Sequence, residues 1–314
     1  MSASEVVSSP SFRQKGVSLL TRLYPLYSGC GSVANHGLIK RMSGDSGNLV
    51  WARVAGGEVL APLDDYVGRA AFYAGELDRK IAWICQRLVR PGDTVLDIGA
   101  NIGMVTVLLA DLVGAEGRVE SFEPNPRMCG LIRAAVQRNG FGQVRLHPVA
   151  LGPVSDTMSL RIPRINAGSA SLVRSFDEAE CDTVTVPVRP LSELLPVGSV
   201  AAIRLMKIDV EGFEAQVFAG ARPLFDAAPP QAVLFELNER STAKLIDEPV
   251  IQFLSGYGYH FFSIPRNLVQ MKLRGFNPAQ TDEVEGHDFL ALAPGAELAA
   301  MSKLVNATGV SNAH

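Results

Sequence analysis

The sequence predicts an α/β protein built on one mostly parallel sheet of seven strands, with the last strand antiparallel to the others. Apolar β-type runs alternate with helical patterns through the middle of the chain, which is typical of a parallel sheet covered by helices on both faces. The last two runs, in contrast, are joined by a polar segment without a helical pattern, which indicates a reversal of direction. The expected strands are residues 94–98, 117–123, 143–149, 201–209, 232–237, 259–264 and 287–294.

Helical patterns follow four of the five parallel strands. Pro126 opens the second of these helices and Asn139-Gly140 closes it, as expected for residues that start and end helices. The third strand is followed instead by an insertion, residues 151–190, which contains two β-type runs of its own. The helical patterns cover residues 102–113, 126–139, 214–225 and 247–258.

The chain before the sheet does not share this alternation. We expect its first 16 residues to be disordered, and we expect a short helix, a β-hairpin around Gly56-Gly57 and a longer helix that Pro91-Gly92 ends. The short helix is placed at residues 19–31, the hairpin at 48–63 and the longer helix within 75–93. The predicted organisation is an N-terminal extension (1–75), one domain (76–298) and a C-terminal tail (299–314).

Composition excludes several classes of protein. The formal net charge is −3 and the sequence pI is about 6.0, so nothing favours a nucleic acid as partner. The four cysteines form no CxxC pair, which fits a reducing compartment and no disulfide framework. The N-terminus lacks an apolar signal sequence, and no apolar run reaches the roughly 18 residues of a membrane span. These features predict a cytoplasmic protein without a membrane span; the oligomeric state stays open.

The segment TVLDIGANIGMVT (94–106) reads as a strand, a tight turn and a helix. A phosphate-binding loop would need Lys-Ser/Thr after the glycines, and a dinucleotide site would need three glycines. Asp97 at the strand end suits a ligand with a positive end, such as S-adenosylmethionine, which carries an ammonium and a sulfonium. In this interpretation Gly99 lets the backbone approach the ligand, Asn101 belongs to the same turn, and Gly103 allows close helix packing. The alternative is a glycine-rich turn without a ligand.

Glu123 ends the second strand, in the stretch SFEPNP. Because neighbouring parallel strands end at the same edge of a sheet, Glu123 should lie beside the glycine turn. Its two oxygens can then accept the hydroxyl groups of a ribose. A solvated strand end is the alternative. Together with Asp97, Glu123 favours S-adenosylmethionine, and Asn125 in the same stretch is assigned to the cofactor site.

Five blocks of the chain, in order, resemble the FkbM family of S-adenosylmethionine-dependent methyltransferases. They are VLDIGANIGMVTVLLA, GRVESFEPNP, VRLHPVALG, MKIDVEGFEAQVFAGA and VLFELNE, within residues 72–240. The resemblance implies a Rossmann-like class I methyltransferase fold and O-methylation of a sugar or natural-product hydroxyl. Family members usually carry an aromatic residue where this chain has Met104. By the same resemblance, Asn166, Gly168 and Ser171 are expected to line the cofactor or acceptor pocket, with a surface loop of small residues as the alternative.

Reacting groups in such a sheet gather at the carboxyl ends of the strands. The candidates there are Asp209 and Glu211 after the fourth strand, Glu236 and Asn238 after the fifth, and His287 and Asp288 at the start of the last. We assign catalysis to Asp209, Glu211 and His287, and substrate binding to Glu236, Asn238 and Ser171. The alternatives are that Asp209 caps the next helix with Glu211 favouring its dipole, and that His287 is an exposed loop residue.

The predicted reaction needs a base or a metal, because a sugar hydroxyl is a poor nucleophile at neutral pH. The acids could hold a divalent cation, but their spacing shows no metal-specific pattern, so no metal ligand is assigned. Lys207, inside an apolar strand, is expected to pair with a carboxylate. Two other functions stay open from sequence: methylation of nitrogen or of a protein side chain, and non-catalytic S-adenosylmethionine binding.

Overall fold

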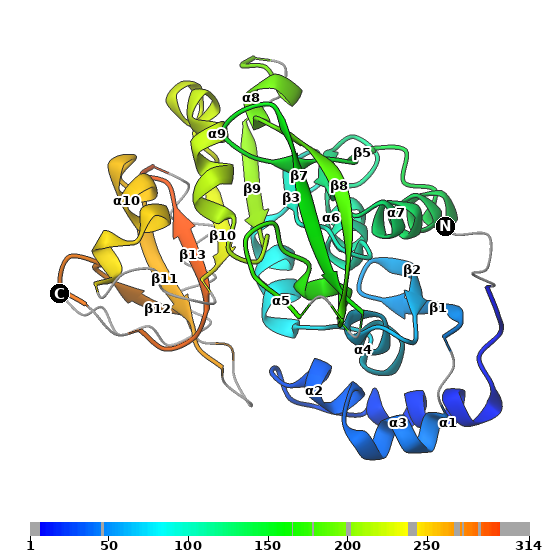
Figure 1. Ribbon diagram of the computed structural model, residues 1–314. Helices are drawn as coiled ribbons and strands as arrows, with labels where there is room; N and C mark the ends of the chain where they lie inside the picture. Colours follow the sequence, from blue (N-terminus) through cyan, green and yellow to red (C-terminus); the bar gives the residue numbers. More distant parts are fainter. Residues whose placement is uncertain are drawn as a thin grey trace.

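Figure 1 shows the computed structural model, which describes residues 7–44, 47–164, 166–177, 179–198, 202–237, 244–266, 271, 273–281 and 284–295. Its main sheet has eight strands in the order β12-β11-β13-β10-β9-β3-β4-β5. Their bounds are β3 Thr94–Ile98, β4 Arg118–Phe122, β5 Val144–His147, β9 Ile203–Ile208, β10 Ala232–Glu236, β11 His260–Ile264, β12 Arg274–Phe276 and β13 Asp288–Leu292.

The strands from β5 to β10 run parallel, and β13 is antiparallel to both of its neighbours, β10 and β11. The predicted α/β class, the parallel sheet and the antiparallel last strand are thus confirmed. The eighth strand, β12, was not predicted. It is a three-residue edge strand, too short to show alternation in the sequence, and it pairs with β11 in a segment expected to lack regular structure.

Helices cover both faces of this sheet. On one face α5 and α6 pack on alternate residues of the strands, such as Val95 and Leu205; on the other, α9 and α10 pack on residues such as Leu96 and Phe235. The alternation follows from the pleat, which sends successive side chains to opposite faces. The helix bounds are α5 Arg79–Leu88, α6 Met104–Val113, α7 Pro126–Asn139, α8 Leu191–Leu194, α9 Glu214–Ala227 and α10 Pro249–Gly256, with short 3₁₀ turns η1 Ala167–Ser169 and η2 Leu245–Asp247.

The insertion forms a second sheet of three strands, β6-β8-β7, in which the two predicted β-type runs are β7 and β8 and pair antiparallel. The bounds are β6 Ala150–Leu151, β7 Asp156–Pro163 and β8 Cys181–Arg189. Between β7 and β8 the chain crosses towards the main sheet, and Ala167 N donates to the carboxylate of Asp65 at 2.7 Å. The insertion therefore covers the end of the main sheet where the polar candidates lie.

The N-terminal segment is more ordered than the sequence suggests. Helix α1 begins at Phe12, inside the stretch expected to be disordered, because Ser11 and Gln14 form a capping box at its start. The predicted helix at 19–31 is wrong: α1 ends at Thr21, and Pro25 separates it from α2. The predicted hairpin is present as β1 and β2. The bounds are α1 Phe12–Thr21, α2 Cys30–Ala34, α3 Gly37–Ser43, β1 Leu49–Val54, β2 Gly57–Pro62 and α4 Tyr66–Ala74.

This segment shares a core with the helices of the sheet. Hairpin residues such as Leu60 and residues of helix α4 pack against Ile102 in the loop before α6, Val107 of α6 and Leu131 of α7. The side chain of Asn139 also bonds both backbone groups of Glu58 in the hairpin, at 2.9 and 2.7 Å. The predicted boundary at residue 75 therefore falls inside a continuous core. The tail from residue 299 lies outside the described residues.

Candidate active site

A cavity of about 610 Å³ opens where the strand order reverses, between the carboxyl ends of β3 and β9. Its walls come from distant parts of the chain: Val67 of α4, Met104 of α6, Gly168 of the insertion and Asp209 after β9 are among them. A smaller apolar cavity of about 80 Å³ adjoins it and is bounded by Glu123 and by residues of α7 and β6. The larger volume lies within the range of small-molecule binding sites.

The glycine turn after β3 is pressed against the segment after β9. Gly99 has a φ of +78°, and a Cβ atom there would lie 1.8 Å from the carbonyl oxygen of Asp209. No residue other than glycine fits this position. Asn101 also adopts a positive φ, 54°, which asparagine tolerates better than most residues, and it lines both cavities. Gly103, φ +89°, starts α6 and passes close to Ile132 of α7 rather than to the strand.

Asp97 does not line either cavity, which corrects its expected contact with a ligand. Its side chain is fully buried; Thr106 Oγ1 donates to one carboxylate oxygen at 2.6 Å, and Lys207 Nζ lies 3.5 Å from the other. The sheet register explains this placement, because Asp97 and Lys207 are direct partners on β3 and β9 and so share a face. Asp97 is a partner of Lys207 beneath the turn.

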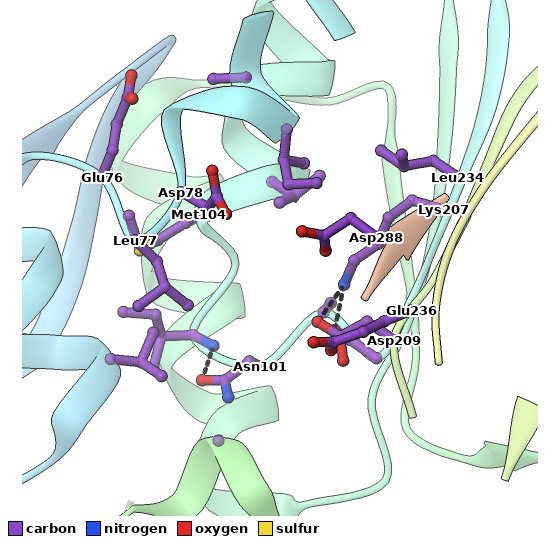
Figure 2. A pocket seen from close by; sticks show the side chains of 18 of the residues that line it. Glu76, Leu77, Asp78, Asn101, Met104, Lys207, Asp209, Leu234, Glu236 and Asp288 are labelled. Atoms are coloured by element: carbon purple, nitrogen blue, oxygen red, sulfur yellow. Dashed lines mark hydrogen bonds and ion pairs between the residues drawn. The ribbon is translucent and has the colours of Figure 1, made fainter. Parts of the chain in front are cut away.

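Lys207 connects the two sides of the turn. Its ammonium donates to the Gly99 carbonyl at 2.9 Å and lies 3.6 Å from the Asp209 carboxylate, as Figure 2 shows. The neighbouring carboxylates raise its pKa above the ordinary value, although burial opposes them. The predicted pairing of Lys207 with a carboxylate is confirmed. The lysine fixes both the turn and Asp209.

Glu123 lies at the smaller cavity, as predicted, but it is buried. Its two carboxylate oxygens accept the backbone N–H groups of Asn101 and Asn125, both at 2.8 Å. Burial raises its pKa to about 7, and the two N–H donors oppose that shift. Each oxygen keeps a lone pair for another donor. The side chain of Asn125, in contrast, caps α7 by accepting from Arg127 N and lines neither cavity, which corrects its expected contact with a cofactor.

Three carboxylates meet on one side of the larger cavity. Asp209, Glu236 and Asp288 come from three neighbouring strands, β9, β10 and β13, and Glu236 and Asp288 are direct partners in the sheet. Burial and the nearby carboxylates, Asp209 first, raise the pKa of Glu236 to about 9. The raised pKa favours the protonated form of Glu236 beside the Asp209 carboxylate. The sequence placed Glu236 at this edge beside Asp209 and Asp288, as found, and assigned it to substrate binding.

Asp288 is held by a lysine that the sequence did not indicate. Lys80 Nζ lies 2.6 Å from the Asp288 carboxylate and 3.2 Å from that of Asp78, which caps α5. The lysine side chain is almost fully buried, and the two carboxylates raise its pKa. Asp78 lies across the cavity from Asp209 (Figure 2). The ion pair between Lys80 and Asp288 ties α5 to β13 and so closes one wall of the cavity.

Glu211 has a different partner. Its carboxylate lies 2.7 Å from Arg174 Nη1 of the insertion, and its backbone adopts a φ of 53°. Ser171 donates to the Glu211 carbonyl and accepts from Arg174 N, at 2.8 and 3.1 Å. Ser171 is buried and does not line the cavities, so it positions the Glu211–Arg174 pair instead of contacting a substrate. Asn166 and Gly168 do line the larger cavity.

His287 lies apart from these groups. It is exposed, its ring faces the Leu237 carbonyl at 3.4 Å, and it does not line the cavity. Strand alternation explains this, since Asp288 beside it points inward. Its expected catalytic position is therefore not found. Asn238 lies outside the described residues. Within the described part of the chain, no cluster of three His, Cys, Asp or Glu side chains is arranged to hold a metal ion.

Comparison with known proteins places the chain in a family. Residues 97–261 match the methyltransferase FkbM domain. The chain belongs to the FkbM methyltransferase family. It is 31% identical over 200 residues to the 31-O-demethyl-FK506 methyltransferase FkbM of Streptomyces tacrolimicus, a match that covers 54% of this chain and 74% of that one. This FkbM-family chain is thus a methyltransferase that uses S-adenosylmethionine.

Other likenesses to this FkbM-family chain are weaker. A 67-residue stretch is 36% identical to the protein-L-isoaspartate O-methyltransferase of Methanocella arvoryzae, covering 21% of this chain and 36% of that one. The structure of methyltransferase FkbM from Methylobacillus flagellatus KT aligns with a TM-score of 0.38 and 15% identity. That alignment covers 67% of this chain and 50% of that one, so this chain spans half the length of that protein.

Proposed function

We propose that the protein transfers a methyl group from S-adenosylmethionine to a hydroxyl of a sugar, glycolipid or secondary metabolite. The observation that carries this proposal is the pair of carboxylates, Asp209 and Glu236, on the wall of the cavity beside the glycine turn. The similarity to a 31-O-demethyl-FK506 methyltransferase supports a hydroxyl on a small molecule.

The residues of the cavities fit the cofactor. The backbone of Gly99 and the side chain of Asn101 line both cavities, and Glu123 has lone pairs for hydroxyl donors at the smaller one. The carboxylates Asp78, Asp209 and Asp288 line the larger cavity, and their negative charge suits a cation. S-adenosylmethionine, when bound, supplies a methyl group on a positively charged sulfur, so the methyl carbon is already activated.

The chain supplies position and a proton acceptor. Glu236 holds the proton of the carboxylate pair, because its pKa is about 9, and this leaves Asp209 to accept a proton. Lys207 fixes Asp209 from the side of the turn. With the cofactor bound, Asp209 would take the proton of the acceptor hydroxyl as its oxygen bonds the methyl carbon, and the electron pair of the broken carbon–sulfur bond would stay on sulfur, giving S-adenosylhomocysteine. Alignment of two reactants in this way contributes on the order of 7–11 kcal/mol to such reactions.

Cofactor binding and product chemistry test the proposal. We expect calorimetry to show binding of S-adenosylhomocysteine and none of NAD. Incubation with methyl-labelled S-adenosylmethionine and a panel of hydroxylated sugars, glycolipids and polyketides should give an acid- and alkali-stable methyl ether. A labelled amine, or a base-labile methyl ester on protein, would instead support the alternative classes. Binding without transfer to any acceptor class would favour a non-catalytic protein.

We also propose a cytoplasmic location. The four cysteines are buried and free of disulfides, as expected in a reducing compartment. No helix in the described part of the chain is long and apolar enough to cross a membrane. Labelling of all four thiols after unfolding without a reductant would agree with this location, and a disulfide in the native protein would contradict it.

A further inference from the structure

Helix α1 is turned with its apolar side outward. The side that faces the protein carries Gln14, Val17, Ser18 and Thr21, of which only valine is apolar. Ser18 donates to the carbonyl of Phe72 at 2.8 Å, and Thr21 donates to that of Tyr73 at 2.5 Å. Hydrogen bonds to α4 thus fix the orientation of α1. A surface helix ordinarily shows the reverse arrangement, with its apolar stripe on the core.

The outward side of α1 and of the turn after it is rich in large apolar residues. Phe12 is 92% exposed, Leu19 70%, Leu20 62% and Leu23 72%. At 100° per residue, Phe12 and Leu19 lie within about 20° of one another around the helix axis, and Leu23 lies in the turn that follows the helix. Phe12 and Leu19 thus mark the two ends of the outward side of α1. Exposed apolar residues that occur singly need no explanation, but four large ones on one short element indicate an interaction surface.

Helix α3 continues this surface. It packs beside α1, and the two helices form a layer at one side of the molecule, away from the main sheet (Figure 1). Leu38 and Met42, one helical turn apart, are exposed on it at 58% and 39%. We call the outward residues of α1, its following turn and α3 the N-terminal face: Phe12, Leu19, Leu20, Leu23, Leu38 and Met42.

The charge around the N-terminal face selects its partner. Between Val6 and Gly44 the sequence contains five Lys or Arg residues and no Asp or Glu, although the whole chain has a net charge of −3. Arg13, Lys15 and Arg41 are exposed beside these apolar residues. A second copy of the same cationic face would be repelled. A nucleic acid would use the cations and leave the leucines in water.

We propose that the N-terminal face docks on the surface of an anionic phospholipid membrane. Apolar side chains on one face of a helix enter the boundary between headgroups and acyl chains, while flanking lysines and arginines reach the lipid phosphates. The binding is peripheral and needs no membrane span. It does not depend on the function proposed for the cavity.

Vesicle sedimentation with the full chain tests this inference. The protein should sediment with vesicles of phosphatidylcholine mixed with phosphatidylglycerol and remain in solution with phosphatidylcholine alone. Replacing Phe12, Leu19 and Leu23 together by Ser should abolish sedimentation. The double variant R13Q/K15Q should lower partitioning about thirtyfold, because each basic residue near an anionic surface contributes about fivefold. This second variant keeps the test valid if the first one unfolds.

Val154→Ser is the matched control. Val154 is 62% exposed and lies in the turn before β7, away from the N-terminal face, so its replacement should leave sedimentation unchanged. Unaltered thermal unfolding and S-adenosylhomocysteine binding check that the variants are folded. The inference fails if wild-type protein ignores anionic vesicles. It also fails if the wild-type protein is a dimer that binds no vesicles and that the serine substitutions dissociate. Binding of oligonucleotides without binding of vesicles would contradict it as well.

Discussion

The carboxylates around the glycine turn and those on the wall of the larger cavity have opposite surroundings. At the ends of β3 and β4, Asp97 and Glu123 are buried, and each accepts hydrogen bonds from the chain itself, although Asp97 Oδ1 has only the Lys207 ammonium near it, at 3.5 Å. At β9, β10 and β13, Asp209, Glu236 and Asp288 face one another, and their repulsion is relieved by a proton and by lysines. The first group is fixed by the chain, and Glu123 keeps lone pairs for a ligand. The second group gains from any cation that enters, and we therefore expect binding to depend on Glu123 and chemistry on the second group.

The largest expected effect is on turnover. Asp209→Asn keeps the shape of the side chain and removes its ability to accept the proton, so kcat should fall by about 10²–10⁴-fold, the usual contribution of a general base. Binding of S-adenosylhomocysteine, measured by calorimetry, should change little. Glu211→Gln should have a smaller effect on kcat, because Arg174 already pairs with that carboxylate.

His287→Ala is the control for this prediction, since His287 is exposed and outside the cavity. The activity of the His287→Ala variant should equal that of the wild type. A wild-type rate for Asp209→Asn would exclude Asp209 as the base. Loss of activity on addition of a chelator would instead assign the activation of the hydroxyl to a metal ion.

The next effect is on stability, in the group of carboxylates around the glycine turn. Lys207→Met leaves Asp97 buried without its cation, and removing one partner of a buried ion pair costs roughly 3–5 kcal/mol. Urea denaturation should show this loss. Adding Asp97→Asn should recover part of it, because the buried negative charge is then gone. If the double variant is no more stable than the single one, the pair does not act as the geometry indicates.

A smaller effect is expected at Glu123. Glu123→Gln keeps one acceptor oxygen and loses the charge, so S-adenosylhomocysteine affinity should fall by about 1.5–3 kcal/mol, roughly tenfold to a hundredfold. Asn125→Ala is the comparison: it removes the cap of α7, which costs about 1 kcal/mol of stability, and should leave affinity unchanged. Equal affinity of the Glu123→Gln and wild-type proteins would refute the ribose assignment.

The last effect is on the pH dependence of stability. The pKa of Glu236 is raised from 4.5 to about 9, so the folded chain holds a proton that the unfolded chain releases. This contribution to stability is complete below pH 4.5 and is lost as the pH rises towards 9. Glu236→Gln should therefore gain thermal stability over the wild type as pH increases through this window. Parallel melting curves of the two proteins would contradict the raised pKa.

Glu123 also makes stability fall as the pH rises, but over a narrower pH range, because its pKa is raised from 4.5 to about 7. The stability of the Glu236→Gln variant should therefore still fall with rising pH up to about pH 7 and change less above it. This difference in range separates the two carboxylates in one series of melting experiments.

The sequence predicted the residues at the strand ends better than their contacts. Asp209, Glu236 and Asp288 were expected at one edge because parallel strands bring their carboxyl ends together, and an antiparallel strand starts there. The burial of Asp97 depends on which residue of β9 lies opposite, and apolar patterns do not set that register. The bond from Lys80 to Asp288 joins residues far apart in the chain, and Arg174 approaches Glu211 only through the fold of the insertion.

The helices and strands of the fold were likewise predicted only in part. Long alternating segments predicted the parallel sheet, and short elements with weak patterns, such as β12 and α4, were missed. Helix α1 was missed for a different reason: after Phe12 its first half, RQKG, is polar, so no apolar periodicity marks its start. Its capping box, Ser11 with Gln14, was the available signal.

The pairing of β3 with β9 has a consequence for how the chain is made. Val95 lies opposite Leu205, so the centre of the sheet stays open on a ribosome until the whole insertion has been synthesised. The N-terminal hairpin likewise waits for α6 and α7 before its apolar side is covered. Contacts between such distant residues slow folding and prolong the exposure of apolar surface. We therefore expect the nascent chain to engage chaperones until β9 emerges, and to be released as a folded protein soon afterwards.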